Sequence, residues 1–226
     1  MPGGPLTYDP AYDPGVGADI SRKFGLSFCL GAFAVESAKL TIVRFADLVP
    51  RPWPNGRGIT RDVAHQNASD GSCEWLISIA ELVEDAEFSH YEGCNRIFTL
   101  VGKNPVDLKI DNLPPLRCNP LLPVHFPGDR PTHCSLAGGP SRAFNVIINR
   151  VHMVGAVSAL SLTGNHRTKL LRRPAAVHCA AGTVKVQGAT LGAGDTLLAP
   201  QGDVVQTDEM PATLLIVDLQ DTRSVA

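Results

Sequence analysis

Residues 183–202 read TVKVQGATLGAGDTLLAPQG, and this stretch carries the pattern that decides the fold. Short runs of β-branched and other apolar residues alternate with turns that contain glycine or proline. The rhythm returns about every ten residues from Lys39 onward, with further apolar runs at 40–45, 75–83, 96–101, 144–149, 175–179 and 213–219. Helical segments do not alternate with these runs, so we expect an all-β sandwich or barrel rather than a parallel α/β sheet.

Composition sets the class of protein and excludes several partners. The chain has 226 residues, of which 44% are apolar and 19% are charged, so it contains enough material for a buried core. Its formal net charge is −2 and neither sign forms a long run. We therefore expect no nucleic-acid partner and no membrane partner. No apolar stretch reaches the roughly 18 residues of a membrane-spanning helix.

The six cysteines form no CxxC pair, and we expect them to be reduced and buried. Residues 21–38 combine two basic residues with an apolar run, which resembles a secretory signal. About 20 residues precede the basic pair, however, whereas a signal begins with its basic residues. We therefore expect a cytoplasmic protein in which this segment belongs to an extension.

Changes in composition and periodicity along the chain predict three parts. Residues 1–39 are rich in glycine, proline and aspartate without periodicity, and we expect an extension that is mobile or docked on the core. Residues 40–155 and 156–226 each carry a series of predicted strands. We expect the first of these two to hold a ligand pocket.

A G-x5-P-x-G motif at residues 194–202 resembles the second signature of the cupin superfamily of small jelly-roll barrels. Metal-dependent cupins carry a histidine three residues after this motif, where this chain has Val205. The counterpart of the first signature, at 88–102, offers His90 alone, with Phe88 at the other histidine position. A metal site needs three or four converging ligands. We expect cupin-like barrels without a metal or another cofactor.

The most specific string lies at residues 45–63 and reads FADLVPRPWPNGRGITRDV. Prolines on both sides stiffen the loop around Trp53, and Asn55 with Gly56 forms a strong turn pair. Arg61 then leaves the loop on a predicted strand. Two interpretations are open at this point: a structural turn with solvated arginines, or a loop that binds a ligand.

This string resembles the opening motif of the HutD/Ves family, which is close to PWKNGGGxTREI. Four further segments resemble family motifs in the same order, at 75–80, 88–100, 126–129 and 138–150, so that the resemblance covers about residues 40–222. It implies two cupin-type (RmlC-like) jelly-roll barrels packed in one compact chain. It also implies a cytoplasmic protein without a recognised catalytic metal.

The resemblance further implies a function and a site. HutD proteins are thought to bind a small carboxylate of histidine utilisation, such as formylglutamate or urocanate, and to moderate the pathway without catalysis. The residues that match the family pattern and are expected to bind the ligand are Trp53, Asn55, Gly56, Thr60, Arg61, Ser78 and Arg96. We expect Arg61 and Arg96 to be the main cations of one cavity, and Asn145 to be a structural amide. A homodimer is left open.

Departures from the family pattern keep alternatives open. The motif lysine is Pro54, the strand arginine is Leu76, and two acidic positions hold Asn95 and Ala143. A carboxylate ligand would therefore meet fewer charge-assisted donors, and the sequence does not identify the ligand. One alternative is a metal-independent, isomerase-like enzyme for a small acid or sugar derivative. The other is an interaction protein with a vestigial pocket.

Overall fold

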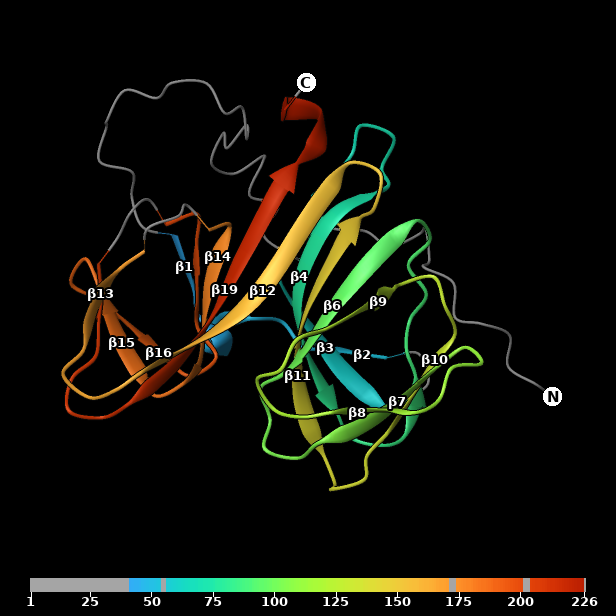
Figure 1. The fold of residues 1–226 in the computed structure, drawn as a ribbon, viewed down its shortest axis with the longest axis horizontal. Helices are drawn as coiled ribbons and strands as arrows, with labels where there is room; N and C mark the ends of the chain where they lie inside the picture. The colour runs from blue at the N-terminus through green and yellow to red at the C-terminus, as the bar shows by residue number, and fades with distance from the viewer. Residues whose placement is uncertain (1–40, 54–55, 171–173, 201–203, 226) are drawn as a thin grey trace. The chain divides into compact units, whose positions relative to one another are not determined.

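The computed structural model describes residues 41–225 except 54–55, 171–173 and 201–203 (Figure 1). Two short 3-10 helices, η2 (Phe45–Asp47) and η3 (Thr222–Val225), are the only helices in this part, and all other elements are strands. The expectation of an all-β protein is confirmed. Among the described residues, no helix has the length and apolar character needed to cross a membrane.

The chain divides into two compact units. Within the described residues, the first unit comprises Val49–Val154, and the second comprises residues 41–48 together with 155–225. Each unit contains two β-sheets with an apolar core cluster to which both sheets contribute. Each is therefore a two-layer sandwich of the kind that buries one face of each sheet.

The first unit is built on a six-stranded antiparallel sheet. Its strands, in order, are β2 (Arg51–Pro52), β3 (Gly58–Asn67), β4 (Cys73–Leu82), β11 (Ser141–Asn149), β6 (Cys94–Leu100) and β9 (Val124–Pro127). The second sheet of this unit has the order β5 (Ala86–Glu87), β10 (Thr132–Ser135), β7 (Val106–Ile110) and β8 (Leu116–Cys118). The core cluster joins Leu82, Phe98 and Leu100 of the first sheet to Val106 and Leu108 of the second.

The second unit has a five-stranded sheet and a four-stranded sheet. The larger one runs β1 (Thr41–Val43), β17 (Thr196–Leu198), β14 (Ala176–Ala181), β19 (Ala212–Asp221) and β12 (Met153–Leu162). The smaller one runs β13 (Arg167–Lys169), β18 (Val204–Gln206), β15 (Thr183–Val186) and β16 (Ala189–Gly192). Val177 and Leu214 of the larger sheet share a core cluster with Val184, Leu191 and Val205 of the smaller.

The described part of the first unit begins at Val49, later than the predicted boundary at residue 40. Residues 40–48 were assigned to the first barrel, but β1 pairs with β17, with Thr41 opposite Leu198. The Arg44 guanidinium also donates to the Asp195 carboxylate at 2.7 Å. These contacts place the described part of this segment in the second unit. The predicted extension at 1–39 lies outside the described residues.

The expectation of two closed barrels is not confirmed. Strands hydrogen-bond within each sheet, and no sheet in the described part of the chain pairs its first strand with its last. The all-β class therefore holds, whereas barrel closure does not follow from the strand pairing.

Two β-bulges interrupt the ladder between β3 and β4. Asp62 pairs with Ser78 but Ala64 pairs with Ile77, so Val63 is the extra residue in β3. At the other end of the ladder, Glu74 is skipped and is the extra residue in β4. A bulge changes which face the following side chains occupy, and the bulge at Val63 matters for the site below.

Candidate functional site

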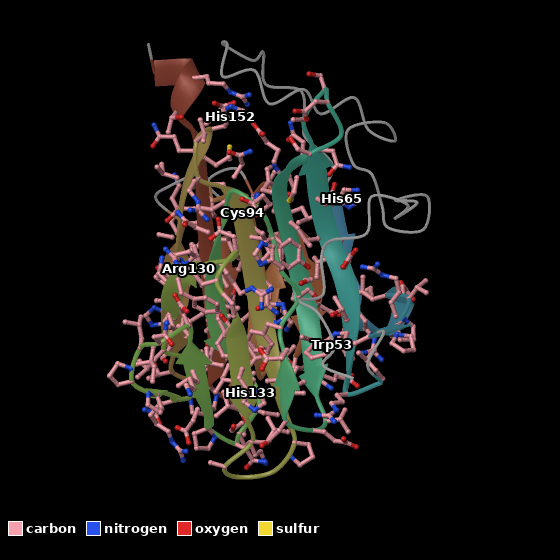
Figure 2. The ribbon with its side chains drawn as sticks, turned by 90° about the vertical axis from the view of Figure 1, so that its right-hand side faces the viewer. Trp53, His65, Cys94, Arg130, His133 and His152 are labelled. Atoms are coloured by element: carbon pink, nitrogen blue, oxygen red, sulfur yellow. The ribbon has the colours of Figure 1, made fainter. Side chains whose placement is uncertain are left out.

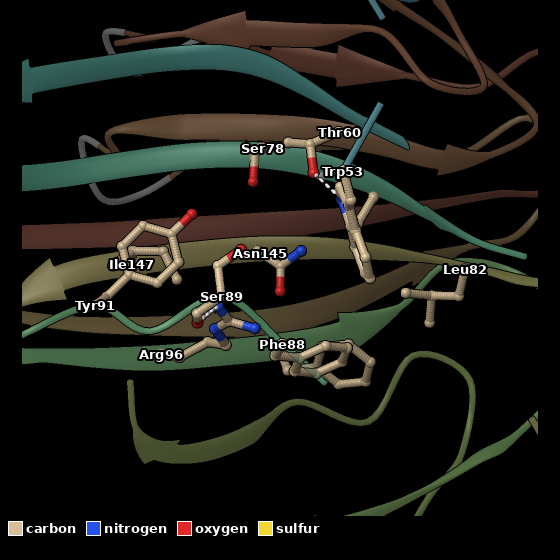
Figure 3. A pocket seen from close by; sticks show the side chains of 12 residues that line it. Trp53, Thr60, Ser78, Leu82, Phe88, Ser89, Tyr91, Arg96, Asn145 and Ile147 are labelled. Carbon is tan, nitrogen blue, oxygen red and sulfur yellow. Dashed lines mark hydrogen bonds between the residues drawn. The ribbon is translucent and has the colours of Figure 1, made fainter. Parts of the chain in front are cut away.

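A small pocket lies on the face of the six-stranded sheet that looks toward the core of the first unit (Figure 3). Its cavity volume is about 30 Å³. A single buried water needs roughly 10–15 Å³, so the cavity has room for a group of carboxylate size. The lining residues are Trp53, Thr60, Ser78, Ala80, Leu82, Phe88, Ser89, Tyr91, Arg96, Phe98, Asn145 and Ile147.

Strand register explains why polar side chains gather here. Asn145 in β11 pairs with Ser78 in β4 and with Phe98 in β6. Directly paired residues share one face of a sheet, so these three side chains point the same way. Arg96 occupies the next position on that face, because it lies two residues before Phe98 on β6.

Arg96 is the cation of the pocket, and it is 6% exposed. Its Nη2 donates to the Ser89 carbonyl oxygen at 3.0 Å. The guanidinium also lies over the rings of Phe88 and Tyr91, at 4.9 and 5.2 Å from their centroids. Burial lowers the pKa of Arg96, but an arginine remains protonated in proteins. The pocket therefore holds a buried positive charge.

No carboxylate in the described part of the chain forms an ion pair with Arg96, and its buried Nε has no hydrogen-bond partner there. Asn145 is 7% exposed, and its buried Oδ1 also lacks a hydrogen-bond partner among the described residues. Buried polar atoms are normally hydrogen-bonded. The pocket thus presents one unused donor and one unused acceptor.

Tyr91 contributes a neutral phenol. Burial raises the pKa of Tyr91, and this effect outweighs the opposing influence of the neighbouring Arg96. The hydroxyl therefore keeps its proton at neutral pH, so this group suits hydrogen bonding better than proton abstraction.

Trp53, which is labelled in Figures 2 and 3, covers one side of the pocket and is fixed there by three contacts. Its Nε1 donates to the Thr60 Oγ1 at 2.7 Å, and its ring meets Phe88 edge to face at 6.2 Å between centroids. The indole also lies directly over Gly58, where an added Cβ would come within 2.8 Å of the ring. A residue without a side chain is therefore required at position 58 for Trp53 to lie where it does.

The structure brings together four of the seven predicted site residues. Trp53, Thr60, Ser78 and Arg96 line the pocket. Gly56 does not line it, but forms an exposed turn at φ 71° that donates its N–H to the Trp53 carbonyl at 2.9 Å. Asn55 lies outside the described residues.

The predicted pair of pocket cations, Arg61 and Arg96, is wrong for Arg61. Its Nη1 donates to Glu81 Oε1 at 2.6 Å, and it does not line the pocket. Thr60 and Arg61 are consecutive residues of β3, so they point to opposite faces of the sheet. Because Thr60 faces the pocket, Arg61 cannot, and the alternation of the strand would have allowed this conclusion from the sequence.

Phe88, Ser89 and Tyr91 are pocket residues that the sequence does not predict, and Asn145 lines the pocket although it is expected to be a structural amide. The first three lie between strands, where alternation gives no orientation. The role of Asn145 depends on β11 lying between β4 and β6, and a local pattern does not show which strands are neighbours.

The residues at the cupin metal positions do not fit a metal ion. Val205 is fully buried in the apolar core of the second unit, and Phe88 packs against that of the first. The twelve pocket residues include no histidine, cysteine, aspartate or glutamate, and Arg96 adds a positive charge. Such a donor set does not attract a cation. The expectation that the protein uses no metal stays a prediction.

Comparisons with known proteins agree on one family. The model of the HutD family matches residues 45–215. An uncharacterized 21.2 kDa protein from the hutC 3′ region of Pseudomonas putida is 34% identical over 115 residues, which are 49% of this chain. The match spans 58% of that relative.

Solved structures show the same likeness. HutD from Pseudomonas fluorescens SBW25, in a formate condition, has a TM-score of 0.69 and 26% identity, over 81% of this chain and 99% of that one. A Cupin 2 conserved barrel domain protein from Leptotrichia buccalis has a TM-score of 0.51 and 13% identity, over 82% of this chain and 98% of that one. The second likeness concerns the fold alone.

Proposed function

The chain belongs to the HutD family, and from that premise we propose that it binds a small carboxylate metabolite at Arg96 without transforming it. The proposal includes the arrangement of two cupin-type jelly-roll barrels. The two facing sheets in each unit and the likeness to cupin structures support that arrangement. It also keeps the expected cytoplasmic location, which the free thiols of five described cysteines favour.

The observation that carries the proposal is the buried guanidinium of Arg96, which has no carboxylate partner among the described residues. Leaving a charge buried and unpaired is costly. A carboxylate from solution would accept from the unused Nε and supply the missing negative charge. Charge-assisted bonds of this kind are worth about 1.5–3 kcal/mol each.

The unused oxygen of Asn145 narrows the class of ligand. It accepts a hydrogen bond, so the preferred carboxylate also carries an N–H or O–H donor. Formylglutamate has an amide N–H and urocanate has an imidazole N–H, and both therefore fit the pair of Arg96 and Asn145. A cavity of about 30 Å³ encloses the carboxylate end, and the remainder of such a molecule would extend toward solvent.

The relatives support a place in histidine utilisation. The P. putida relative is a protein from the hutC 3′ region, and the P. fluorescens neighbour is a HutD protein. We propose the same setting for this chain, in which binding of a pathway carboxylate moderates the pathway.

Thermal unfolding with formylglutamate, urocanate and glutarate tests the proposal. Glutarate has the carboxylates of formylglutamate but no N–H donor. We expect saturable stabilisation in the order formylglutamate above glutarate, reaching about 2.7 kcal/mol at 100 times the Kd. Arg96→Leu should abolish the response to every ligand. Asn145→Leu should remove the difference between formylglutamate and glutarate.

Arg61→Gln is the matched control, because Arg61 also matches a family motif but lies outside the pocket. It should keep the full response. If Arg96→Leu responds like the unmodified protein, the pocket assignment fails. If NMR shows that a bound metabolite is converted, the protein is an enzyme rather than a binding protein.

A further inference from the structure

A buried carboxylate, that of Asp62, lies on the pocket face of the six-stranded sheet. In the ladder between β3 and β4, Asp62 pairs directly with Ser78, which lines the pocket. Directly paired residues share one face of a sheet, so the Asp62 side chain points to the side of the sheet that carries the pocket. Thr60, another lining residue, is the preceding residue on that face of β3. The Asp62 carboxylate therefore borders the pocket on β3, three strands away from Arg96 on β6.

Arg51 holds this carboxylate in place from the edge of the sheet. Its Nη2 donates to the Asp62 Oδ2, and β2, which carries Arg51, is the first strand of the sheet. The Asp62 side chain is only 5% exposed, whereas that of Arg51 is 40% exposed. Water therefore screens the positive charge of Arg51 more strongly than the negative charge of Asp62.

The phenol of Tyr91 responds to both charges. Burial is the main cause that raises the pKa of Tyr91, and Arg96 opposes it. Asp62 raises this pKa further, whereas Arg51 lowers it by a smaller amount. Because Tyr91 lines the pocket, the charge of Asp62 acts there and outweighs that of its partner.

The two charged ends of the pocket face give it a direction. Arg96 lies at one end on β6 and Asp62 at the other on β3, and Asn145 and Ser78 lie on the two strands between them (Figure 3). Neighbouring strands are about 4.8 Å apart, so these two backbones are separated by about 14 Å, and both side chains narrow that gap. An acid of about five carbon atoms that binds Arg96 through its carboxylate would direct its other end past Ser78 toward Asp62.

We propose that Asp62 selects the far end of the bound acid, because it favours a protonated nitrogen there and disfavours a second carboxylate. Opposite charges attract and like charges repel most strongly where little water separates them. The inference rests on the proposed binding of a carboxylate at Arg96. It narrows the class of ligand from carboxylates with a hydrogen-bond donor to monocarboxylates that carry a basic nitrogen.

Three acids of five carbon atoms test this selection, since they differ at the far end alone. The far end is an ammonium group in 5-aminopentanoate, a methyl group in pentanoate and a carboxylate in glutarate. Isothermal titration calorimetry of the full chain at pH 8 measures each Kd. Histidine side chains are mostly neutral at this pH, so no charge comes from His65, which the bulge at Val63 returns to the pocket face opposite Leu76. We expect 5-aminopentanoate to bind most tightly and glutarate least, with at least about a tenfold difference in Kd.

Two variants separate the charge of Asp62 from the structural role of its ion pair. Asp62→Asn and Arg51→Gln both break this pair, but they remove opposite charges. Asp62→Asn should reduce the ratio of the glutarate Kd to the 5-aminopentanoate Kd to about twofold or less, and Arg51→Gln should raise it. Asp107→Asn is the matched control and should leave the ratio unchanged, because it breaks an exposed Arg–Asp pair, with Arg117, in the other sheet of the unit.

Circular dichroism checks that the variants fold, and the expected rise in Arg51→Gln carries the test alone if Asp62→Asn does not fold. The inference is overturned if glutarate binds the unmodified protein as tightly as 5-aminopentanoate, or if both variants shift the ratio in the same direction. In either case, saturable binding of pentanoate shows that the carboxylate site at Arg96 still stands. If none of the three acids binds, the proposed function fails and this inference fails with it.

Discussion

Both units pack two sheets face to face, but the side chains between the sheets differ in polarity. In the second unit, the positions between the sheets are apolar on both sides, as at Val177, Leu214 and Val205. In the first unit, the corresponding face carries Ser78, Asn145 and Arg96 beside its apolar cluster. A sandwich of two sheets therefore keeps its form when part of its interior is polar, provided that the rest of the cluster remains apolar.

Placing an arginine in the second unit should have the largest effect. Val205 is fully buried among apolar side chains, so Val205→Arg buries a charge without a partner. We expect a loss of more than about 4 kcal/mol in the free energy of unfolding, measured by urea titration with circular dichroism. Val205→Ala, with an expected loss of about 1–3 kcal/mol, is the control. Equal midpoints for the two variants would contradict the comparison.

Removing the buried arginine of the pocket, Arg96, should change the free energy of unfolding in the opposite direction. Arg96→Leu replaces a buried, unpaired cation by an apolar side chain, which is neutral or stabilising by up to about 2 kcal/mol. Unfolding followed by tryptophan fluorescence measures this change in the free energy of unfolding, because both tryptophans, Trp53 and Trp75, lie in the first unit. A loss above about 1 kcal/mol would instead show that Arg96 supports the fold through Ser89 and the surrounding rings.

The Asp195 carboxylate of the second unit should make a contact with Arg44 that is lost in acid. Burial raises the pKa of Asp195, but hydrogen bonds from Arg44, Gly192 and Phe45 outweigh burial and leave the pKa below its usual range. The carboxylate therefore stabilises the fold above about pH 4, and this stabilisation is lost as the pH falls through the lowered pKa.

Asp195→Asn tests this contact. The variant should be about 1 kcal/mol less stable at pH 7, and its deficit should shrink to nothing in acid. Urea titrations at several pH values between 7 and 2, followed by circular dichroism, measure both quantities. A deficit that stays constant with pH would show that the charge of Asp195 contributes nothing.

Two tryptophan variants, with effects on stability of similar or smaller size, should distinguish the pocket from the rest of the first unit. Trp53→Phe removes the bond to Thr60, and Trp75→Phe removes a similar bond from Trp75 to Gln66 at 3.1 Å. Each should cost about 0.5–1.5 kcal/mol. A change of fluorescence on adding formylglutamate should persist in Trp75→Phe and vanish in Trp53→Phe. The reverse result would place the ligand elsewhere.

Local patterns predicted the strands and the family, but not everything that depends on neighbours in space. Strand alternation and turn residues were enough to expect an all-β chain, and Trp53, Thr60, Ser78 and Arg96 were found through the family motifs. Arg61 was misplaced because alternation was not applied to its neighbour Thr60. Asn145 was undervalued because its partners on β4 and β6 come from strands that are distant in sequence.

The assignment of β1 failed for a related reason. Residues 41–43 lie shortly before Val49, where the described part of the first unit begins, and no pattern in them indicates a partner at 196–198. Apolar runs and turn residues indicate where a strand begins and ends, whereas the pairing of strands that are distant in sequence is decided by the whole fold.

The pairing of β1 with β17 also fixes an order of events during synthesis. Strand β1 leaves the ribosome before Val49–Val154, the described part of the first unit, yet its partner, around Leu198, follows only about 150 residues later. At about 5–20 residues per second, β1 waits on the order of 10–30 s with an unpaired edge. The first unit can fold within this interval, so the second unit is necessarily the last to be completed.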